Sequence, residues 1–164
     1  MNRSDFKQYY DQYFDPLRSY LYYRSGNQAL ATDLSQEVFL IVWQKQMRIF
    51  PEQTPAVFFK IAKDLFISHL RKQKVRELHL QTLKLDFSQN EAVQRMSFTD
   101  LQAQYERLLA AMPEKQRVVF LMNRMEGATY REIAARLNLS VKAIEKRMHL
   151  AISFLKKHLQ SHER

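Results

Sequence analysis

The first 76 residues show a helical pattern of hydrophobic and polar positions that is interrupted at two places. Apolar and aromatic residues recur every three or four positions over residues 6–21, 29–43 and 56–70, which is the spacing of amphipathic helices. The turn residues Ser25-Gly26-Asn27 separate the first two segments, and a loop bracketed by Pro51 and Pro55 separates the second from the third. The pattern therefore predicts three helices, the last ending in a basic run over residues 71–76.

The second half begins with a stretch of weak periodicity. Residues 77–100 are mixed and polar, and we interpret them as a tether that is partly helical at most. Helices are predicted over residues 101–112, which Pro113 ends, and over residues 114–125, which Gly127 ends. The expected fold is all-α, with two small helical domains, residues 1–76 and 101–164, joined by the tether.

Glycine and proline usage agrees with this fold class. Only Gly26 and Gly127 occur in 164 residues, which leaves few sites for the positive-φ turns of hairpin-rich folds. Pro16 lies inside the first predicted helix, and we expect it to bend or interrupt that helix.

Residues 129–155 carry the sequence features of a helix-turn-helix. Thr129 and Glu132 form a capping box at the start of one helix. Asn138 lies where the chain needs a left-handed residue, and Ser140 can cap the second helix. Leu139 is expected to fill the space between the helices. The buried positions predicted for the pair are Ile133, Ala134, Leu137, Val141, Ile144, Met148, Ile152 and Leu155.

The outer face of the second helix is suited to DNA. Cationic side chains there can contact phosphate or guanine, and Glu145 can accept from a cytosine amino group. Alternatively, Glu145 is an i,i+4 partner of His149 or a group that rejects wrong sites. His149, His158 and His162 lack carboxylate or cysteine partners at ligand spacing, so no metal site is expected. The predicted DNA contacts of this face are Lys142, Glu145, Lys146, Arg147 and His149.

Charge and composition narrow the class of function. The net charge is +9, and it is concentrated in residues 51–85, with 7 basic and 3 acidic side chains, and in residues 113–164, with 11 and 5. Two basic blocks suggest two contact surfaces for a polyanion. The chain has no cysteine and no long apolar run, so disulfides, thiolate chemistry and a membrane span are not expected. We expect a cytoplasmic protein.

Two blocks of the sequence resemble one known family. The C-terminal block is similar to region 4 of the extracytoplasmic-function (ECF) sigma factors, and the N-terminal block resembles region 2 of the same family. The blocks occur in family order, and the tether between them is of family-like length. The matching stretches are residues 111–120 (AMPEKQRVVF), 126–127 (EG), 130–134 (YREIA) and 140–147 (SVKAIEKR) for region 4, and 33–43 (DLSQEVFLIVW), 59–64 (FKIAKD) and 69–71 (HLR) for region 2.

The resemblance implies a protein that binds the core of RNA polymerase and directs it to promoters. The predicted helix over residues 31–43 would dock on the clamp helices of the largest polymerase subunit. Asp33, Gln36 and Glu37 would supply its polar contacts. Leu34, Phe39 and Trp43 pack either internally or at that interface, whereas Val38 and Ile41 are expected to lie in the core. No cofactor and no catalytic residue is implied.

The resemblance also assigns the third predicted helix to the opened −10 element, while region 4 would bind the −35 element as a duplex. Bases leaving a duplex need a pocket with aromatic walls, and Phe50 and the loop after it are candidates, whereas Phe58 and Phe59 are expected to lie in the core. The predicted contacts of this helix are Lys60, Lys63, Asp64, Arg71, Lys72 and Lys74. Val57, Asp64 and Glu145 depart from common family residues, which leaves the promoter sequence open.

The ends of the helix-turn-helix segment most resemble a particular branch of the family. Residues 144–146 and 154–159 are similar to the branch coupled to outer-membrane uptake receptors. This resemblance implies a membrane-bound anti-sigma factor as a partner.

Two other interpretations compete with the sigma factor. A repressor or activator with a sensory N-terminal domain would not need a basic third helix far from the helix-turn-helix. An enzyme acting on nucleic acid would need a carboxylate cluster or an activated nucleophile, but the acidic residues are scattered along the chain.

Overall fold

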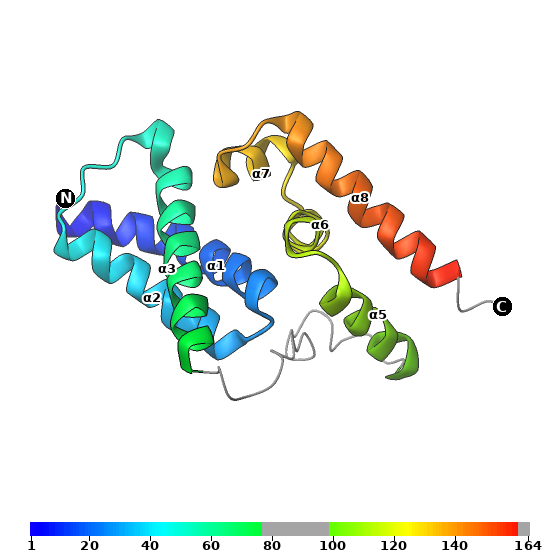
Figure 1. The fold of residues 1–164 in the computed structure, drawn as a ribbon. Helices are drawn as coiled ribbons and strands as arrows, with labels where there is room; N and C mark the ends of the chain where they lie inside the picture. Colours follow the sequence, from blue (N-terminus) through cyan, green and yellow to red (C-terminus); the bar gives the residue numbers. More distant parts are fainter. Residues whose placement is uncertain (77–98, 161–164) are drawn as a thin grey trace.

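The computed structural model describes residues 1–76 and 99–160, and the regular elements there are all helices. The predicted tether falls almost entirely outside the described residues. The all-α class and the two helical units are confirmed (Figure 1). The elements are α1 (Arg3–Ser25), α2 (Gln28–Gln44), the short 3-10 helix η1 (Pro51–Gln53), α3 (Thr54–Arg76), α5 (Thr99–Ala111), α6 (Glu114–Glu126), α7 (Tyr130–Leu137) and α8 (Val141–Gln160).

The N-terminal unit is built from α1, α2 and α3. Asn2 caps α1, Gly26 ends it in the left-handed conformation with φ 62°, and Asn27 then caps α2. Pro16 lies within α1, so the expectation that it could interrupt the helix was wrong. The carbonyl that Pro16 leaves without an amide partner belongs to Gln12, an exposed residue, where water can satisfy it.

The core of this unit is aromatic and aliphatic. Phe58 and Phe59 are buried, as predicted, and Phe58 lies between Tyr13 and Phe39, with ring centroids 5.4 and 5.1 Å away. Further core residues of this unit include Leu17, Leu21, Ala31, Leu34, Val38, Val42, Ala62 and Phe66. Such rings bury large apolar areas and make favourable tilted and stacked contacts.

The C-terminal unit contains α5, α6, α7 and α8, with α6 packed against α8. Gly127 ends α6 in the left-handed conformation with φ 65°, as the sequence predicted. Val119, Met122 and Ile144 are buried at the centre of the unit. Val141 was expected to be buried but is 37% exposed, because it is the first residue of α8 and lies at the end of the helix.

The two units pack against each other. Helix α1 contacts α6, and α3 contacts α7, and the buried apolar residues of both units form one connected cluster. Figure 1 shows α1–α3 on one side and α5–α8 on the other, with the start of α1 and the end of α8 at opposite sides.

Candidate nucleic-acid interface

The helix-turn-helix forms as its local sequence predicted. The Thr129 side chain accepts from the Glu132 amide, and the Glu132 carboxylate accepts from the Thr129 amide at 2.7 Å. The hydrogen bond from the Thr129 amide is the main cause that holds the pKa of the Glu132 carboxyl below its usual value, and the Thr129 side chain adds to the shift. Asn138 takes the left-handed conformation at φ 52° and ψ 50°, and the Ser140 hydroxyl accepts from the Ala143 amide at 3.1 Å. Capping and turn chemistry thus fix where α8 begins.

The outer face of α8 is available to a ligand. Lys142, Glu145, Lys146 and His149 are exposed, whereas Arg147 is half-buried. Ile144 and Met148 are buried on the opposite face and anchor the helix to α6. The structure therefore presents four of the predicted DNA contacts together, at the end of α8 that can enter a major groove.

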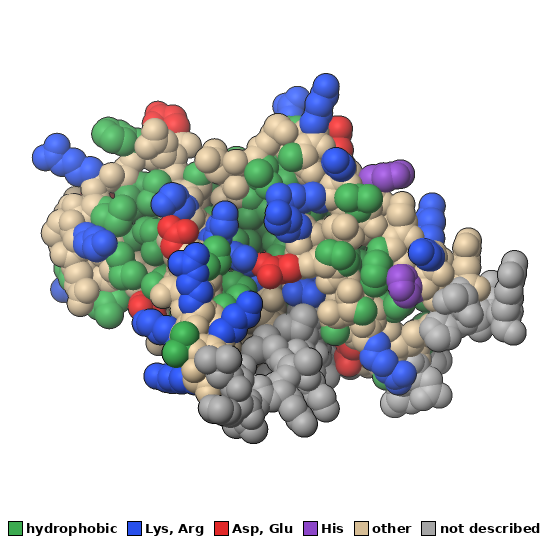
Figure 2. Space-filling model, in the orientation of Figure 1, with side chains coloured by type: hydrophobic (Ala, Val, Ile, Leu, Met, Phe, Trp, Pro, Cys, Tyr) green, Lys and Arg blue, Asp and Glu red, His purple; other side chains and the backbone are tan. Residues whose placement is uncertain are grey.

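A second basic face runs along α3. Lys60, Lys63, Arg71, Lys72 and Lys74 are all exposed. Figure 2 shows Lys and Arg side chains gathered over α3 and, separately, at the end of α8 that follows α7. The two basic blocks of the sequence are therefore two basic surfaces on different units.

Two further predicted contacts of the N-terminal unit have distinct surroundings. The Asp64 carboxylate pairs with Lys60 one turn earlier at 3.2 Å, so it lies among cations on the same face. Phe50 is 61% exposed and immediately precedes η1. An exposed ring on a short loop next to a basic helix can stack against an unpaired base.

The outer face of α2 is polar with an apolar end. Asp33, Gln36 and Glu37 are exposed, as a docking face requires. Leu34 and Phe39, by contrast, are 5% and 2% exposed. Leu34 therefore packs internally, whereas Phe39 also lines the groove beside Trp43, and a contact of either residue with polymerase stays a prediction.

Sequence analysis missed Leu40, which extends the apolar part of the α2 surface next to Trp43. Leu40 is 52% exposed and Trp43 37%, and with Phe6 and Tyr10 of α1 they line a groove of about 410 Å³. A signal was present, because Leu40 follows Gln36 by four positions and so lies on the polar face.

Residues 1–76 and 99–160 contain no cluster of three potential metal ligands. His158 stacks on Phe154 with ring centroids 4.1 Å apart, and His162 lies outside the described part. No helix in the described part has the length and hydropathy needed to cross a bilayer.

Fold and surfaces together define a DNA-binding protein with a helix-turn-helix and a second basic helical domain. Comparison with known families extends this: residues 9–76 match the model of sigma-70 region 2, and residues 102–155 match that of sigma-70, region 4. The chain belongs to the ECF sigma factors, whose two regions act in promoter recognition and transcription initiation.

Individual relatives agree with this assignment. The chain is 26% identical to the ECF RNA polymerase sigma factor SigE of Mycolicibacterium smegmatis over 92% of its own length and 60% of that protein. It is 28% identical to the ECF RNA polymerase sigma factor RpoE of Cereibacter sphaeroides, covering 90% of this chain and 83% of that one. It is 24% identical to the ferric citrate uptake sigma factor FecI of Escherichia coli, covering 90% and 86%.

A solved structure shares the fold. The sigma factor RpoE of Bartonella quintana, crystallised with the anti-sigma factor NepR, superposes with a TM-score of 0.67 at 21% identity, over 95% of this chain and 97% of that one. The resemblance therefore extends to both helical units.

The exposed cations predict strongly salt-dependent DNA binding. With about five phosphate contacts, the log–log slope of affinity for a −35 duplex against salt concentration should be about −4 to −5. Fluorescence anisotropy with the full chain measures it. Replacing Lys142 and Lys146 together by Gln should bring the slope about 2 closer to zero. A wild-type slope near zero would contradict the electrostatic basis of binding.

Proposed function

We propose that the three exposed surfaces divide the work of a sigma factor. The outer face of α2, with Asp33, Gln36 and Glu37, binds RNA polymerase core together with Trp43 at its end. The basic face of α3 and the exposed Phe50 hold the opened −10 element. The outer face of α8 binds the −35 element as a duplex, through Lys142, Glu145, Lys146, Arg147 and His149.

One observation carries this proposal above the alternatives. Within residues 1–76 and 99–160, helices α3 and α8 present exposed basic faces on separate units, and of these two only α8 belongs to a helix-turn-helix. A regulator that binds a single duplex site leaves the second basic face, on α3, without a role. A sigma factor needs both, because duplex contact and strand opening occur at different elements.

The domain limits and the cellular setting follow from the same proposal. We assign residues 1–76 to the polymerase and −10 unit, 77–100 to the linker and 101–164 to the −35 unit. Action on RNA polymerase core places the protein in the cytoplasm, without catalysis or cofactors of its own. A membrane-bound anti-sigma factor is the proposed regulator, supported by the ferric citrate uptake relative and by the anti-sigma complex of the structural neighbour.

Reversing charge on α2 tests the docking face. We expect Asp33→Lys with Glu37→Lys to weaken binding to polymerase core by at least about tenfold, because like charges would face the partner's cations. Both side chains are exposed, so helical content by circular dichroism should not change. Co-elution with core on gel filtration, followed by titration, measures the effect.

The matched control reverses two carboxylates elsewhere in the same unit. Asp11→Lys with Asp15→Lys makes the same change of charge on exposed positions of α1. That variant should bind core like the wild type. Equal affinity of the α2 variant and the wild type would show that docking uses another surface.

A further inference from the structure

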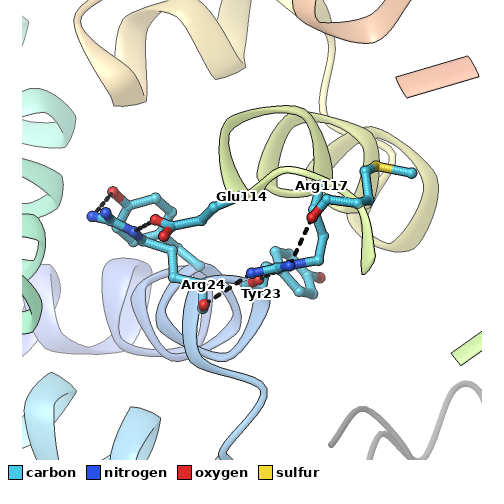
Figure 3. Close-up of polar contacts among 6 residues, drawn as sticks. Tyr23, Arg24, Glu114 and Arg117 are labelled. Atoms are coloured by element: carbon cyan, nitrogen blue, oxygen red, sulfur yellow. Dashed lines mark hydrogen bonds and ion pairs between the residues drawn. The ribbon is translucent and has the colours of Figure 1, made fainter. Parts of the chain in front are cut away.

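The contact between the two units is built around a buried arginine. Arg117, in the first turn of α6, is 3% exposed. Its Nε donates to the Tyr23 carbonyl at 2.8 Å and its Nη2 to the Arg24 carbonyl at 3.1 Å (Figure 3). These carbonyls belong to the last turn of α1, where the helix leaves acceptors unsatisfied. A side chain of the C-terminal unit thus caps a helix of the N-terminal unit.

An ion pair flanks this cap. Arg24 of α1 pairs through Nε with the carboxylate of Glu114, the first residue of α6 (Figure 3). Its guanidinium is held in place within its own unit, because Nη1 donates to the Tyr20 hydroxyl at 3.1 Å and the group lies 4.8 Å from the Phe66 ring centroid. The Arg24 side chain is 12% exposed and that of Glu114 36%. The pair is therefore shielded on its α1 side and open to solvent on its α6 side.

The second contact joins α3 to the helix-turn-helix. Arg136 of α7 pairs with Glu126 at 2.8 Å and places its guanidinium 5.7 Å from the centre of the Phe59 ring. Next to it, α3 and the α7–α8 turn line a cleft of about 490 Å³. Lys60 and Lys63 line one side of this cleft, and residues 137–139 line the other.

This closeness conflicts with binding to both promoter elements. A cleft of this size holds one small molecule, so a strand of several nucleotides that entered it would compete with the α7–α8 turn for the side of α3 that Lys60 and Lys63 line. The elements at −10 and −35 lie roughly 85 Å apart at about 3.4 Å per base pair. Helices α3 and α8 cannot span that distance while α3 and the turn before α8 share one cleft.

We propose that the α1–α6 contact is an intramolecular latch, with the Arg24–Glu114 pair as its releasable part. The latch holds the free chain in a closed form, in which the helix-turn-helix covers part of the α3 surface. Binding to polymerase core and promoter requires the open form, so the latch weakens the apparent affinity by the fraction of molecules that are closed. This inference rests on the proposed function, which assigns α3 and α8 to different promoter elements.

Reversing one charge should open the latch, and exchanging both should close it again. The variants are Arg24→Glu, Glu114→Arg and the double exchange. Lys115→Glu, an exposed neighbour in the same turn of α6, matches the charge change of Arg24→Glu without touching the pair. Glu114→Gln removes the negative charge of the pair at its solvent-exposed residue. This variant replaces Arg24→Glu in the experiment if Arg24→Glu loses helical content by circular dichroism.

The distance between the units is measured by energy transfer. The chain has no cysteine, so Gln8→Cys on α1 and Lys156→Cys on α8, both exposed, can be labelled with a dye pair. In the free chain, we expect lower transfer efficiency for either single reversal, recovery in the double exchange, and no change for Lys115→Glu. The latch would be overturned if the transfer efficiency of both single reversals and of Glu114→Gln equalled that of the wild type.

The second measurement is affinity for polymerase core. The single reversals should bind core roughly three- to tenfold more tightly than the wild type, and the double exchange should return to wild-type affinity. Lower transfer efficiency without tighter binding would overturn the inhibitory role and leave a simple packing contact. If neither the wild type nor any variant bound core, the proposed function would be wrong. The energy-transfer result would still decide whether the contact between the two units exists.

Discussion

Replacing Arg117 by Met should cost about 3–5 kcal/mol of unfolding free energy, since a buried group that serves several acceptors is lost. Besides the two carbonyls of α1, its Nη1 donates to the carbonyls of Met112 and Leu109 at 3.0 and 3.3 Å. Met fills much of the volume but donates to none of them. Four carbonyls at or just after the ends of two helices would each lose one donor at once.

Urea titration followed by circular dichroism measures the change, and the melting temperature should fall by roughly 6–20 °C for a chain of this length. Arg107→Met on α5 is the control, because Arg107 is exposed and its loss should stay within about 0.5 kcal/mol. Arg117→Lys should also destabilise the chain, since one ammonium cannot reach carbonyls on two helices. A loss below about 1 kcal/mol for Arg117→Met would contradict the capping role.

Burial of Arg117 illustrates what the sequence could not show. Desolvation lowers the pKa of its guanidinium, with Glu114 opposing the shift, but neither effect has a local sequence signal. The residue lies in a basic segment and has the pattern of a solvent-exposed position. Its main acceptors, Tyr23 and Arg24, precede it by more than 90 positions. Only the packing of the two units brings them together.

Local features, in contrast, were predictable. The capping box of Thr129, the left-handed Asn138 and the Ser140 cap each depend on residues within four positions of one another, so the limits of α7 and α8 follow from the sequence. The first-half helices follow from periodicity. Leu34 and Phe39 were ambiguous, because an apolar residue on an amphipathic helix can face the core or a partner with the same spacing.

The candidate DNA contacts fall between these cases. Periodicity places Lys142 and Lys146 opposite the buried Ile144 and Met148, so their exposure could be predicted. The orientation of the α3 cations toward a cleft shared with the α7–α8 turn could not, because it depends on how the two units pack.

Separate defects in duplex binding and strand opening are expected from the two basic faces. Lys146→Ala removes an exposed cation from the outer face of α8. If Lys146 contacts a base, closed-complex formation at the −35 element should weaken by about 1–3 kcal/mol, a loss of roughly 5- to 150-fold. Electrophoretic mobility shift with the polymerase–sigma complex, below the temperature of promoter opening, measures this step.

The double variant Lys63→Ala with Arg71→Ala should form the closed complex at the −35 element nearly as well as the wild type. It should instead impair opening of the promoter at −10. Both side chains are exposed on α3, where we place the phosphates of the separated −10 strand. Their loss should lower the permanganate reactivity of thymines near −10 by roughly tenfold or more, because two charge-assisted phosphate contacts contribute only after the strands separate. Lys7→Ala on the exposed face of α1 provides a control for the loss of positive charge.

A promoter that is already melted around −10 distinguishes the two defects most sharply. Melting removes the free-energy cost of unpairing, which the α3 contacts offset in a duplex promoter, but it leaves the −35 duplex unchanged. Transcription by the Lys63/Arg71 variant should therefore recover on this template much more than transcription by Lys146→Ala. Equal recovery of both variants would mean that α3 and α8 act on the same form of DNA, and the chain would then be better described as a regulator that binds duplex alone.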